Sequence, residues 1–169
     1  LLTAKPIIYA TNVSEEDLAE GNAYCTEVIN LAASEGAETV RISAQVEAEL
    51  IELGDDERTD YLEGLGVSEG GLQSLIQATY RLLGLRTYFT TGEKETRAWT
   101  FKAGMTAPQA AGVIHSDFER GFIRAQTIGW EKLIKAGSLA EARNKGWLRS
   151  EGKEYVVDEG DVMEFLFNV

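Results

Sequence analysis

Two short polar motifs near the start of the chain carry side chains that could contact the base of a nucleotide. Asn12-Val13-Ser14-Glu15 follows directly on an apolar run, and Ser43-Ala44 follows a second strand-like segment in the same manner. In open α/β sheets, ligands bind at the carboxyl ends of the strands. An Asn amide there can hydrogen-bond N7 and an exocyclic group of a purine. The structural alternative is a turn for the first motif and a helix cap for the second.

A strand–helix–strand unit is expected to position these motifs. The continuous apolar run 6–10 predicts a strand buried on both faces, and residues 38–42 predict a second strand. Between them, Ser14 or Asp17 is expected to cap a helix that ends at Glu35-Gly36. Two parallel strands cannot cover both of their own faces, and the chain starts without Met almost inside the first strand. We therefore expect a fragment of an α/β fold with further elements upstream.

Helical patterns continue to residue 83. One runs from Val46 to Leu62, and a second spans 72–83, with Ser68 or Glu69 as its candidate cap. The acidic run Asp55-Asp56-Glu57 is expected to be a solvated helix start, because carboxylates are favourable near the amino end of a helix dipole. Metal binding is the alternative for this run. The sequence predicts no metal site elsewhere.

Charge divides the chain into two parts of different chemistry. The 169 residues carry a net charge of −12, yet residues 1–83 hold 16 acidic against 4 basic side chains, whereas residues 84–169 hold 12 of each. With 44% hydrophobic and 26% charged residues, the chain is expected to be globular. No apolar run approaches the roughly 18 residues that span a bilayer, and no secretory signal is recognisable. A single cysteine, Cys25, fits a cytoplasmic protein, and it is expected to pack as a small hydrophobe rather than act as a redox switch.

Strand patterns dominate after Gly84. Segments 85–90 and 97–102 alternate apolar and polar residues and are expected to form a hairpin around a turn at 91–94. Thr106 and Pro108 predict a helix start. A strand at 122–128, a short helix at 131–135 and strands at 155–157 and 163–167 complete the order β-β-α-β-(α)-β-β. This order is that of a small β-grasp, ubiquitin-like sheet. Six apolar side chains are expected in its core: Trp99, Phe101, Ile114, Val156, Phe165 and Phe167.

A basic segment with interleaved aromatic residues is the candidate RNA-binding surface. Between residues 120 and 153 there are eight basic side chains and only three acidic ones, and two Trp lie among them. Phosphate charges paired with cations, and bases stacked on rings, are the contacts that such a composition provides. A mixed solvated surface with core aromatics is the alternative. The candidates are Arg120, Arg124, Lys132, Lys135, Arg143, Lys145, Trp147, Arg149 and Lys153, with Trp130 also within reach.

His115, the only histidine, is expected to pack or to hydrogen-bond in a turn. No carboxylate or nucleophile is spaced as its catalytic partner, so we assign no catalytic residue. A ligand contact is the alternative for His115.

With these motifs and their spacing, the chain resembles the YchF branch of the Obg-related GTPases, which is marked by Asn-x-x-Glu where other members have Asn-Lys-x-Asp. The resemblance runs from Leu2 through the two polar motifs to the carboxy-terminal residues. Its most specific stretches are 87–92, 97–100, 107–112, 114–122 and 165–169. It implies that residues 1–83 are the end of a nucleotide-binding G domain, that 84–169 form a TGS domain, and that the fold class is α+β, with a partial α/β P-loop-type segment before a β-grasp domain.

The resemblance also assigns the base-binding residues and a preference for adenine. Asn12, Val13, Glu15, Ser43 and Ala44 stand where the family contacts the base, and a Ser-Ala in this place turns its backbone amide toward it. In a guanine-binding protein the Asp accepts hydrogen bonds from the N1–H and the 2-amino group of the base, and adenine lacks both donors. The longer Glu15 disturbs this pair of hydrogen bonds. Backbone groups near Val13 can still meet the adenine edge.

Departures from the family pattern limit what this chain should do alone. The sequence contains no Gly-x-x-x-x-Gly-Lys-Ser/Thr loop, no switch segments and no Mg²⁺-binding residues of the family, nor its helical arm. We therefore expect no hydrolysis and no tight nucleotide binding by these 169 residues. ATP or GTP with Mg²⁺ is the cofactor expected for the full-length protein.

The family implies that residues 84–169 contact the ribosome or another RNA, because TGS domains recur in RNA-associated proteins. A protein–protein interaction module without RNA contact is the alternative, and a free-standing enzyme is a third class that lacks any nucleophile, metal cluster or phosphate loop in support. No DNA sequence recognition and no membrane partner are expected.

Overall fold

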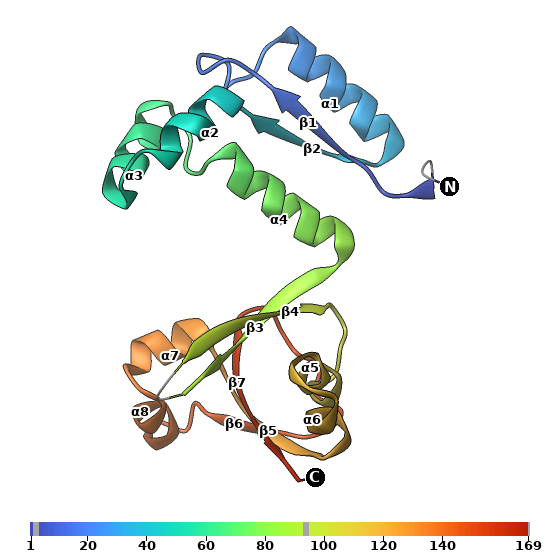
Figure 1. Ribbon diagram of the computed structural model, residues 1–169, viewed down its shortest axis with the longest axis vertical. Helices are drawn as coiled ribbons and strands as arrows, with labels where there is room; N and C mark the ends of the chain where they lie inside the picture. Colours follow the sequence, from blue (N-terminus) through green and yellow to red (C-terminus); the bar gives the residue numbers. More distant parts are fainter. Residues whose placement is uncertain (2–3, 93–94, 169) are drawn as a thin grey trace. The chain divides into compact units, whose positions relative to one another are not determined.

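The computed structural model describes residues 1, 4–92 and 95–168, and it divides into two compact units, Leu1–Leu83 and Gly84–Val169 (Figure 1). The boundary falls where the acidic part of the sequence ends. Each unit has its own sheet and is described by itself.

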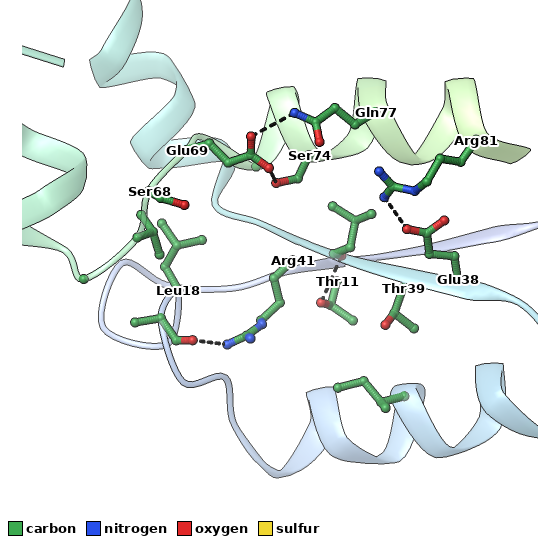
Figure 2. Close-up of a pocket in the computed structure, with 16 residues that line it drawn as sticks. Thr11, Leu18, Glu38, Thr39, Arg41, Ser68, Glu69, Ser74, Gln77 and Arg81 are labelled. Carbon is green, nitrogen blue, oxygen red and sulfur yellow. Dashed lines mark hydrogen bonds and ion pairs between the residues drawn. The ribbon is translucent and has the colours of Figure 1, made fainter. Parts of the chain in front are cut away.

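The first unit is built on two parallel strands. β1 (Ile8–Asn12) pairs with β2 (Glu38–Ile42), and α1 (Ala23–Glu35) is the crossover between them. The second predicted strand is confirmed at its stated bounds, whereas the first begins two residues later than expected. The expectation that the first strand is buried on both faces is wrong, because no residue of β1 is buried. Arg41 of β2 donates to the carbonyl oxygen of Ala19 at 2.7 Å, which ties the loop before α1 to the sheet (Figure 2).

The predicted start of the first helix is wrong. Neither Ser14 nor Asp17 caps α1; its N-cap is Asn22, whose side chain accepts from the Cys25 amide at 3.1 Å. Gly21 has φ +76, a left-handed conformation that interrupts any helix begun earlier. Asp17 instead accepts from the Asn22 side-chain amide at 2.8 Å, so it orients the cap. The predicted end is confirmed, because Gly36 is a left-handed C-cap.

Three helices complete the first unit: α2 (Ala44–Ile51), α3 (Asp55–Gly64) and α4 (Gly71–Leu83). The apolar pattern from Val46 to Leu62 is thus two helices, and their apolar faces pack around Leu18, Val46 and Leu50. α4 lies against β2 at Gly71, where a Cβ would come within 2.7 Å of the Ile42 Cα. The first turn of α4 is bound by Glu47, which accepts from the Leu72 amide at 3.2 Å. Glu69, a predicted cap, accepts instead from the side chains of Ser74 and Gln77.

The second unit is a mixed five-stranded sheet with the strand order β4-β3-β7-β5-β6. β3 (Leu85–Thr91) and β4 (Thr96–Lys102) form the expected antiparallel hairpin, and its predicted turn includes residues 93 and 94, which lie outside the described residues. β5 (Phe122–Gly129) pairs antiparallel with both β6 (Arg149–Glu151) and β7 (Asp161–Phe167). β3 and β7 run parallel in the middle of the sheet.

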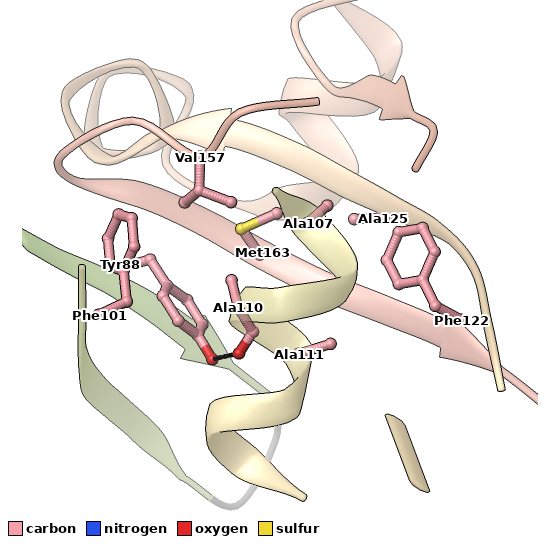
Figure 3. Close-up of a cluster of buried hydrophobic side chains, with 9 residues drawn as sticks. All are labelled: Tyr88, Phe101, Ala107, Ala110, Ala111, Phe122, Ala125, Val157 and Met163. Atoms are coloured by element: carbon pink, nitrogen blue, oxygen red, sulfur yellow. Dashed lines mark hydrogen bonds between the residues drawn. The ribbon is translucent and has the colours of Figure 1, made fainter. Parts of the chain in front are cut away.

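Four helices pack on the two faces of this sheet. α5 (Ala107–Ile114), capped by Thr106 as predicted, and α6 (Ser116–Arg120) lie on one face. Their side of the sheet holds the larger core, in which the alanines of α5 pack on Tyr88, Phe101 and Met163 (Figure 3). α7 (Trp130–Ala136) and α8 (Leu139–Asn144) lie on the other face, over Phe89, Ile128 and Val162. The sequence pattern did not predict α6, α8 or β6.

One predicted strand and one predicted core residue are wrong. Residues 155–157 form only an isolated bridge, between Val156 and Thr106, rather than a strand of the sheet. Because the Val157 amide donates to the Met105 carbonyl in this bridge, alternation turns Val157 inward (fully buried) and leaves Val156 47% exposed. Phe101 is buried, and Trp99, Ile114 and Phe165 pack against the core as predicted. Phe167 is half-buried and stacks on Phe118 with 3.9 Å between ring centroids.

Candidate functional site

The two polar motifs meet at the carboxyl ends of β1 and β2. Asn12 is the last residue of β1, and its Oδ1 accepts from the Ala44 amide, the first of α2, at 3.0 Å. Ser43 between β2 and α2 is 1% exposed, and its Oγ accepts from the Val46 amide as the N-cap of α2. Ser43 therefore caps α2, as its alternative role predicted, and the two motifs lie next to each other. We call Asn12, Val13, Glu15, Ser43 and Ala44 the strand-end cluster.

Val13 and Glu15 hold the loop after β1 in place. The Val13 amide donates to the Ile42 carbonyl at 2.8 Å, and the Val13 side chain packs against the Leu18–Val46–Leu50 core. The Glu15 carbonyl accepts from the Leu18 amide at 3.1 Å, and the Glu15 side chain is half-buried. Within the cluster, the backbone amides of Val13 and Ala44 both have protein partners. Among the described residues no partner engages the side-chain Nδ2 of Asn12, so this group can donate to a ligand.

Tyr61 of α3 is a neighbour of this cluster that sequence reasoning did not assign to it. Its hydroxyl donates to Glu49 Oε2 at 2.5 Å. That hydrogen bond, together with burial and the nearby negative charge of Glu15, raises the pKa of Tyr61 to about 12. Tyr61 stands within the stretch on which the resemblance rests, but no spacing rule connects residue 61 with residue 15.

A separate hollow of about 460 Å³ lies between the loop before α1, β2 and α4 (Figure 2). Its charged side chains are engaged with protein groups: Arg81 pairs with Glu38, Arg41 binds the Ala19 carbonyl, and Glu69 accepts from Ser74 and Gln77. None of the strand-end cluster lines it. This hollow is therefore distinct from the candidate base-binding site.

The basic candidates of the second unit do not form one surface. Arg149 binds Glu151 (3.0 Å) and the Tyr155 hydroxyl (2.8 Å), beside the buried Asp161, and Arg120 pairs with Asp117. Residues 125, 127, 149 and 151 face the α5 side of the sheet, because Ala125 pairs with Glu151 and Thr127 with Arg149. Arg124 lies on the opposite face. Arg120 and Arg149 are thus already paired with carboxylates, and Arg149 does not share a face with Arg124.

Two of the remaining basic residues are brought together. Arg124 of β5 and Arg143 of α8 line a hollow of about 370 Å³ whose other walls are Gln126, Glu164, Phe165 and Leu166. Lys132 and Lys135 are exposed on α7, and Lys153 is exposed in a turn. Lys145 lies over the Trp147 ring at 5.0 Å from its centroid, a cation–π contact. Trp130 is 47% exposed, with its ring against Gly160.

The other singled-out residues have local partners. His115 Nδ1 accepts from the Asp117 amide at 3.2 Å, so it caps α6 in the turn role expected for it. Asp55 pairs with Arg58, and Cys25 is buried. Among residues 1, 4–92 and 95–168, no group of three or more His, Cys, Asp or Glu is placed to hold a metal ion. None of the helices described in the structure is long and apolar enough to cross a bilayer.

Comparison with known proteins gives one consistent result. Residues 85–168 match the family model YchF-GTPase_C, described as a protein of unknown function (DUF933). The chain is 54% identical to the "Ribosome-binding ATPase YchF" of Bacillus subtilis, over all of this chain and 47% of that protein. It is 52% identical to the protein of the same name in Escherichia coli O157:H7, over 99% of this chain and 46% of that protein. The chain thus spans about half the length of the curated relatives it matches.

Solved structures agree. The Schizosaccharomyces pombe YchF GTPase superposes with a TM-score of 0.85 and 36% identity, covering 98% of this chain and 44% of that one. A GTP-binding protein from Pyrococcus horikoshii shares the fold, with a TM-score of 0.66 and 18% identity over 97% of this chain and 46% of that one. From the family match, the identities over its whole length and the shared structure, the chain belongs to the YchF family and represents the carboxy-terminal part of its proteins.

Proposed function

We propose that this chain is the base-contacting and ribosome-contacting part of a cytoplasmic ATPase that prefers adenine to guanine. The first unit supplies the strand-end cluster to the base. The second unit supplies the contact with the ribosome. Phosphates and Mg²⁺ would be held by other residues of the full-length protein, because these 169 residues contain no phosphate-binding loop motif.

The observation that carries the nucleotide part is the hydrogen bond between Asn12 Oδ1 and the Ala44 amide. It joins the two motifs at adjacent strand ends, where open α/β sheets bind ligands. With Oδ1 committed to Ala44, Asn12 Nδ2 remains as a donor, and N7 of adenine is an acceptor. Val13 occupies the place of the Lys in Asn-Lys-x-Asp, and its side chain packs into the core instead of lying over a base.

The test of base preference is a chimera in which residues 1–169 replace the corresponding half of the Bacillus subtilis relative. We expect it to hydrolyse ATP faster than GTP. The double substitution Val13→Lys with Glu15→Asp should shift the ATP/GTP ratio toward GTP by about 1–3 kcal/mol, the usual value of a correctly placed pair of hydrogen bonds to a base edge. The control is Glu16→Asp, an exposed neighbour. An unchanged ratio in the double variant would refute base contact by this loop.

The second unit is proposed to be a TGS-type β-grasp domain that binds ribosomal RNA. The strand order β4-β3-β7-β5-β6, with β3 and β7 parallel at its centre and α5 packed across one face, supports a β-grasp sheet. The relatives named ribosome-binding support the partner.

Co-sedimentation of the 169-residue chain with purified ribosomes tests this part. We expect the chain to pellet with ribosomes, and less of it to pellet as the salt concentration rises, because phosphate contacts release counterions. Brief RNase treatment should release it. Binding that survives RNase would favour the protein–protein alternative, and a chain that stays in the supernatant would exclude ribosome association by these residues.

A further inference from the structure

The hollow lined by Arg124 and Arg143 has a defined arrangement on the sheet. Arg124 lies directly opposite Leu166, and Gln126 directly opposite Glu164, in the antiparallel pairing of β5 with β7. Directly opposed side chains on one face are about 5 Å apart at Cβ. Arg143 of α8 forms the third wall. Two guanidinium groups, an amide and a carboxylate therefore border one cavity of about 370 Å³ beside an exposed Leu166 (47%).

The polar groups of this hollow are available for a ligand. In the part of the chain that the structure describes, no hydrogen bond or ion pair engages the side chains of Arg124, Gln126, Arg143 or Glu164. Arg120 and Arg149, equally basic in the sequence, are both neutralised by carboxylates. Among the described residues, the arginines thus divide into those that are paired with a carboxylate and those that are not. Two arginines that border one hollow from a strand and a helix, in a chain of net charge −12, offer the paired donors that an anion requires.

We propose that this hollow binds single-stranded RNA, with Arg124 and Arg143 on the phosphates and Glu164 selecting a base that carries an exocyclic amino group. This inference rests on the proposed ribosome association and deepens it. Guanidinium groups pair with phosphate oxygens in a bidentate fork. The RNA is single-stranded because only unstacked bases can reach a cavity in a protein wall.

Glu164 gives the site its preference. A carboxylate accepts the amino hydrogen of cytosine N4, while uracil has a carbonyl oxygen in the same place and is repelled. Glu164 is exposed at the edge of the hollow, so its carboxylate can be reached by a base whose phosphate lies on the arginines. An acidic peptide could pair with the arginines, but its carboxylates offer no donor to Glu164. A nucleotide supplies both a phosphate for the arginines and an amino group for Glu164, so this combination of groups favours RNA.

Fluorescence anisotropy of the whole chain with 12-nucleotide oligocytidine and oligouridine tests the arginines first. The variant Arg124→Gln/Arg143→Gln should bind oligocytidine at least tenfold more weakly, and its log–log salt slope should fall in magnitude by about 1.4, since each phosphate contact on a single strand contributes about 0.7. The matched control is Lys132→Gln/Lys135→Gln, which removes two exposed charges of α7. Equal losses in both variants would refute a specific site.

The same two RNAs test whether Glu164 selects the base. The unmodified chain should bind oligocytidine about tenfold more tightly than oligouridine, and Glu164→Gln should reduce that ratio to within twofold, because an amide can both donate and accept. Glu131→Gln, on exposed α7, should leave the ratio unchanged. Equal affinity of the unmodified chain for both RNAs refutes the base selection, and tighter binding of an oligoglutamate peptide than of either RNA refutes RNA as the ligand.

Ribosome co-sedimentation separates the two proposals. If the arginine double variant pellets with ribosomes as well as the unmodified chain does, this hollow is not the contact, although the ribosome association stands. If the unmodified chain does not pellet at all, the proposed function itself fails. Circular dichroism of each variant confirms that its fold is retained.

Discussion

The two units bury their side chains to very different extents. In the second unit the sheet is covered on both faces, and its cores include Tyr88, Phe101, Ile128 and Met163, each at most 2% exposed. In the first unit a two-stranded sheet supports one small cluster around Val46. Large apolar side chains of its α1, such as Tyr24 (78%) and Leu31 (49%), are exposed. A two-stranded sheet is marginal by itself, so the second unit should be much the more stable of the two.

This difference bears on how each unit holds its candidate site. The strand-end cluster is fixed mainly by hydrogen bonds between a loop and a helix start, such as Asn12 to Ala44. The basic hollow stands on the strands of a well-packed sheet. Sites on packed strands are held more rigidly than sites on loops. We therefore expect the first site to become ordered with its ligand and the second to be preformed.

The largest expected effect is on the core of the second unit. Phe101→Ala should lower its free energy of unfolding by about 3–5 kcal/mol, because it removes a buried ring and leaves a cavity. All three Trp lie after residue 84, so Trp fluorescence in urea reports this unit alone. Val156→Ala, at a 47% exposed side chain, should change stability by about 0.5 kcal/mol or less. Similar losses for the two variants would contradict the assignment of the core.

The same pair of residues shows where the sequence pattern was sufficient and where it failed. Phe101 lies in a strand whose alternation fixes the inward face, and it was predicted correctly. Val156 was predicted inward because segment 155–157 was taken for a sheet strand. Its actual partner is Thr106, 50 residues earlier in the chain. No local pattern contains such a long-range pairing.

The two candidate sites differ in the same way, because one depends on consecutive strands and the other on pairing between distant segments. The two polar motifs each follow a strand, and parallel pairing of consecutive strands brings their ends together, so their contact could be expected from the sequence. The basic segment 120–153 was judged by counting charges. Such a count cannot tell that β5 and β6 turn Arg149 and Arg124 to opposite faces, nor that Glu164 would enter the same hollow.

We expect stability losses of intermediate size when the two serine helix caps are removed. Ser43 caps α2 in the first unit and is 1% exposed, whereas Ser138 caps the short α8 in the second unit and is exposed. Ser43→Ala should cost about 1–2 kcal/mol, because the buried Val46 amide also loses its acceptor. Ser138→Ala should cost about 0.5–1 kcal/mol. Far-UV circular dichroism during heating, compared with Trp fluorescence, measures both.

The two probes should respond differently to the two substitutions. Ser43→Ala should shift the circular dichroism transition and leave the Trp transition in place, since the units are separate compact bodies. Ser138→Ala should shift the Trp transition. Coincident shifts of both probes in both variants would show that the two units unfold as one cooperative structure.

The smallest effect is a pH dependence within the second unit. The hydrogen bond from Arg120 lowers the pKa of Asp117 below its ordinary value of 3.8; burial of Asp117 opposes this shift, and the charges of Arg120 and His115 add to it. A carboxyl group whose pKa is lower in the folded state stabilises the fold above its unfolded pKa, and this contribution is lost as the pH falls through the folded value. Asp117→Asn should therefore be less stable than the unmodified chain at pH 7, and the difference should shrink as the pH drops below about 4. Urea unfolding followed by Trp fluorescence at pH 7 and pH 3 measures this difference in stability.

The control for this prediction is Glu119→Gln, an exposed neighbour on α6, which should show little difference in stability from the unmodified chain at either pH. If Asp117→Asn is as much less stable than the unmodified chain at pH 3 as it is at pH 7, the substitution destabilises the fold through altered packing rather than through the loss of a charge.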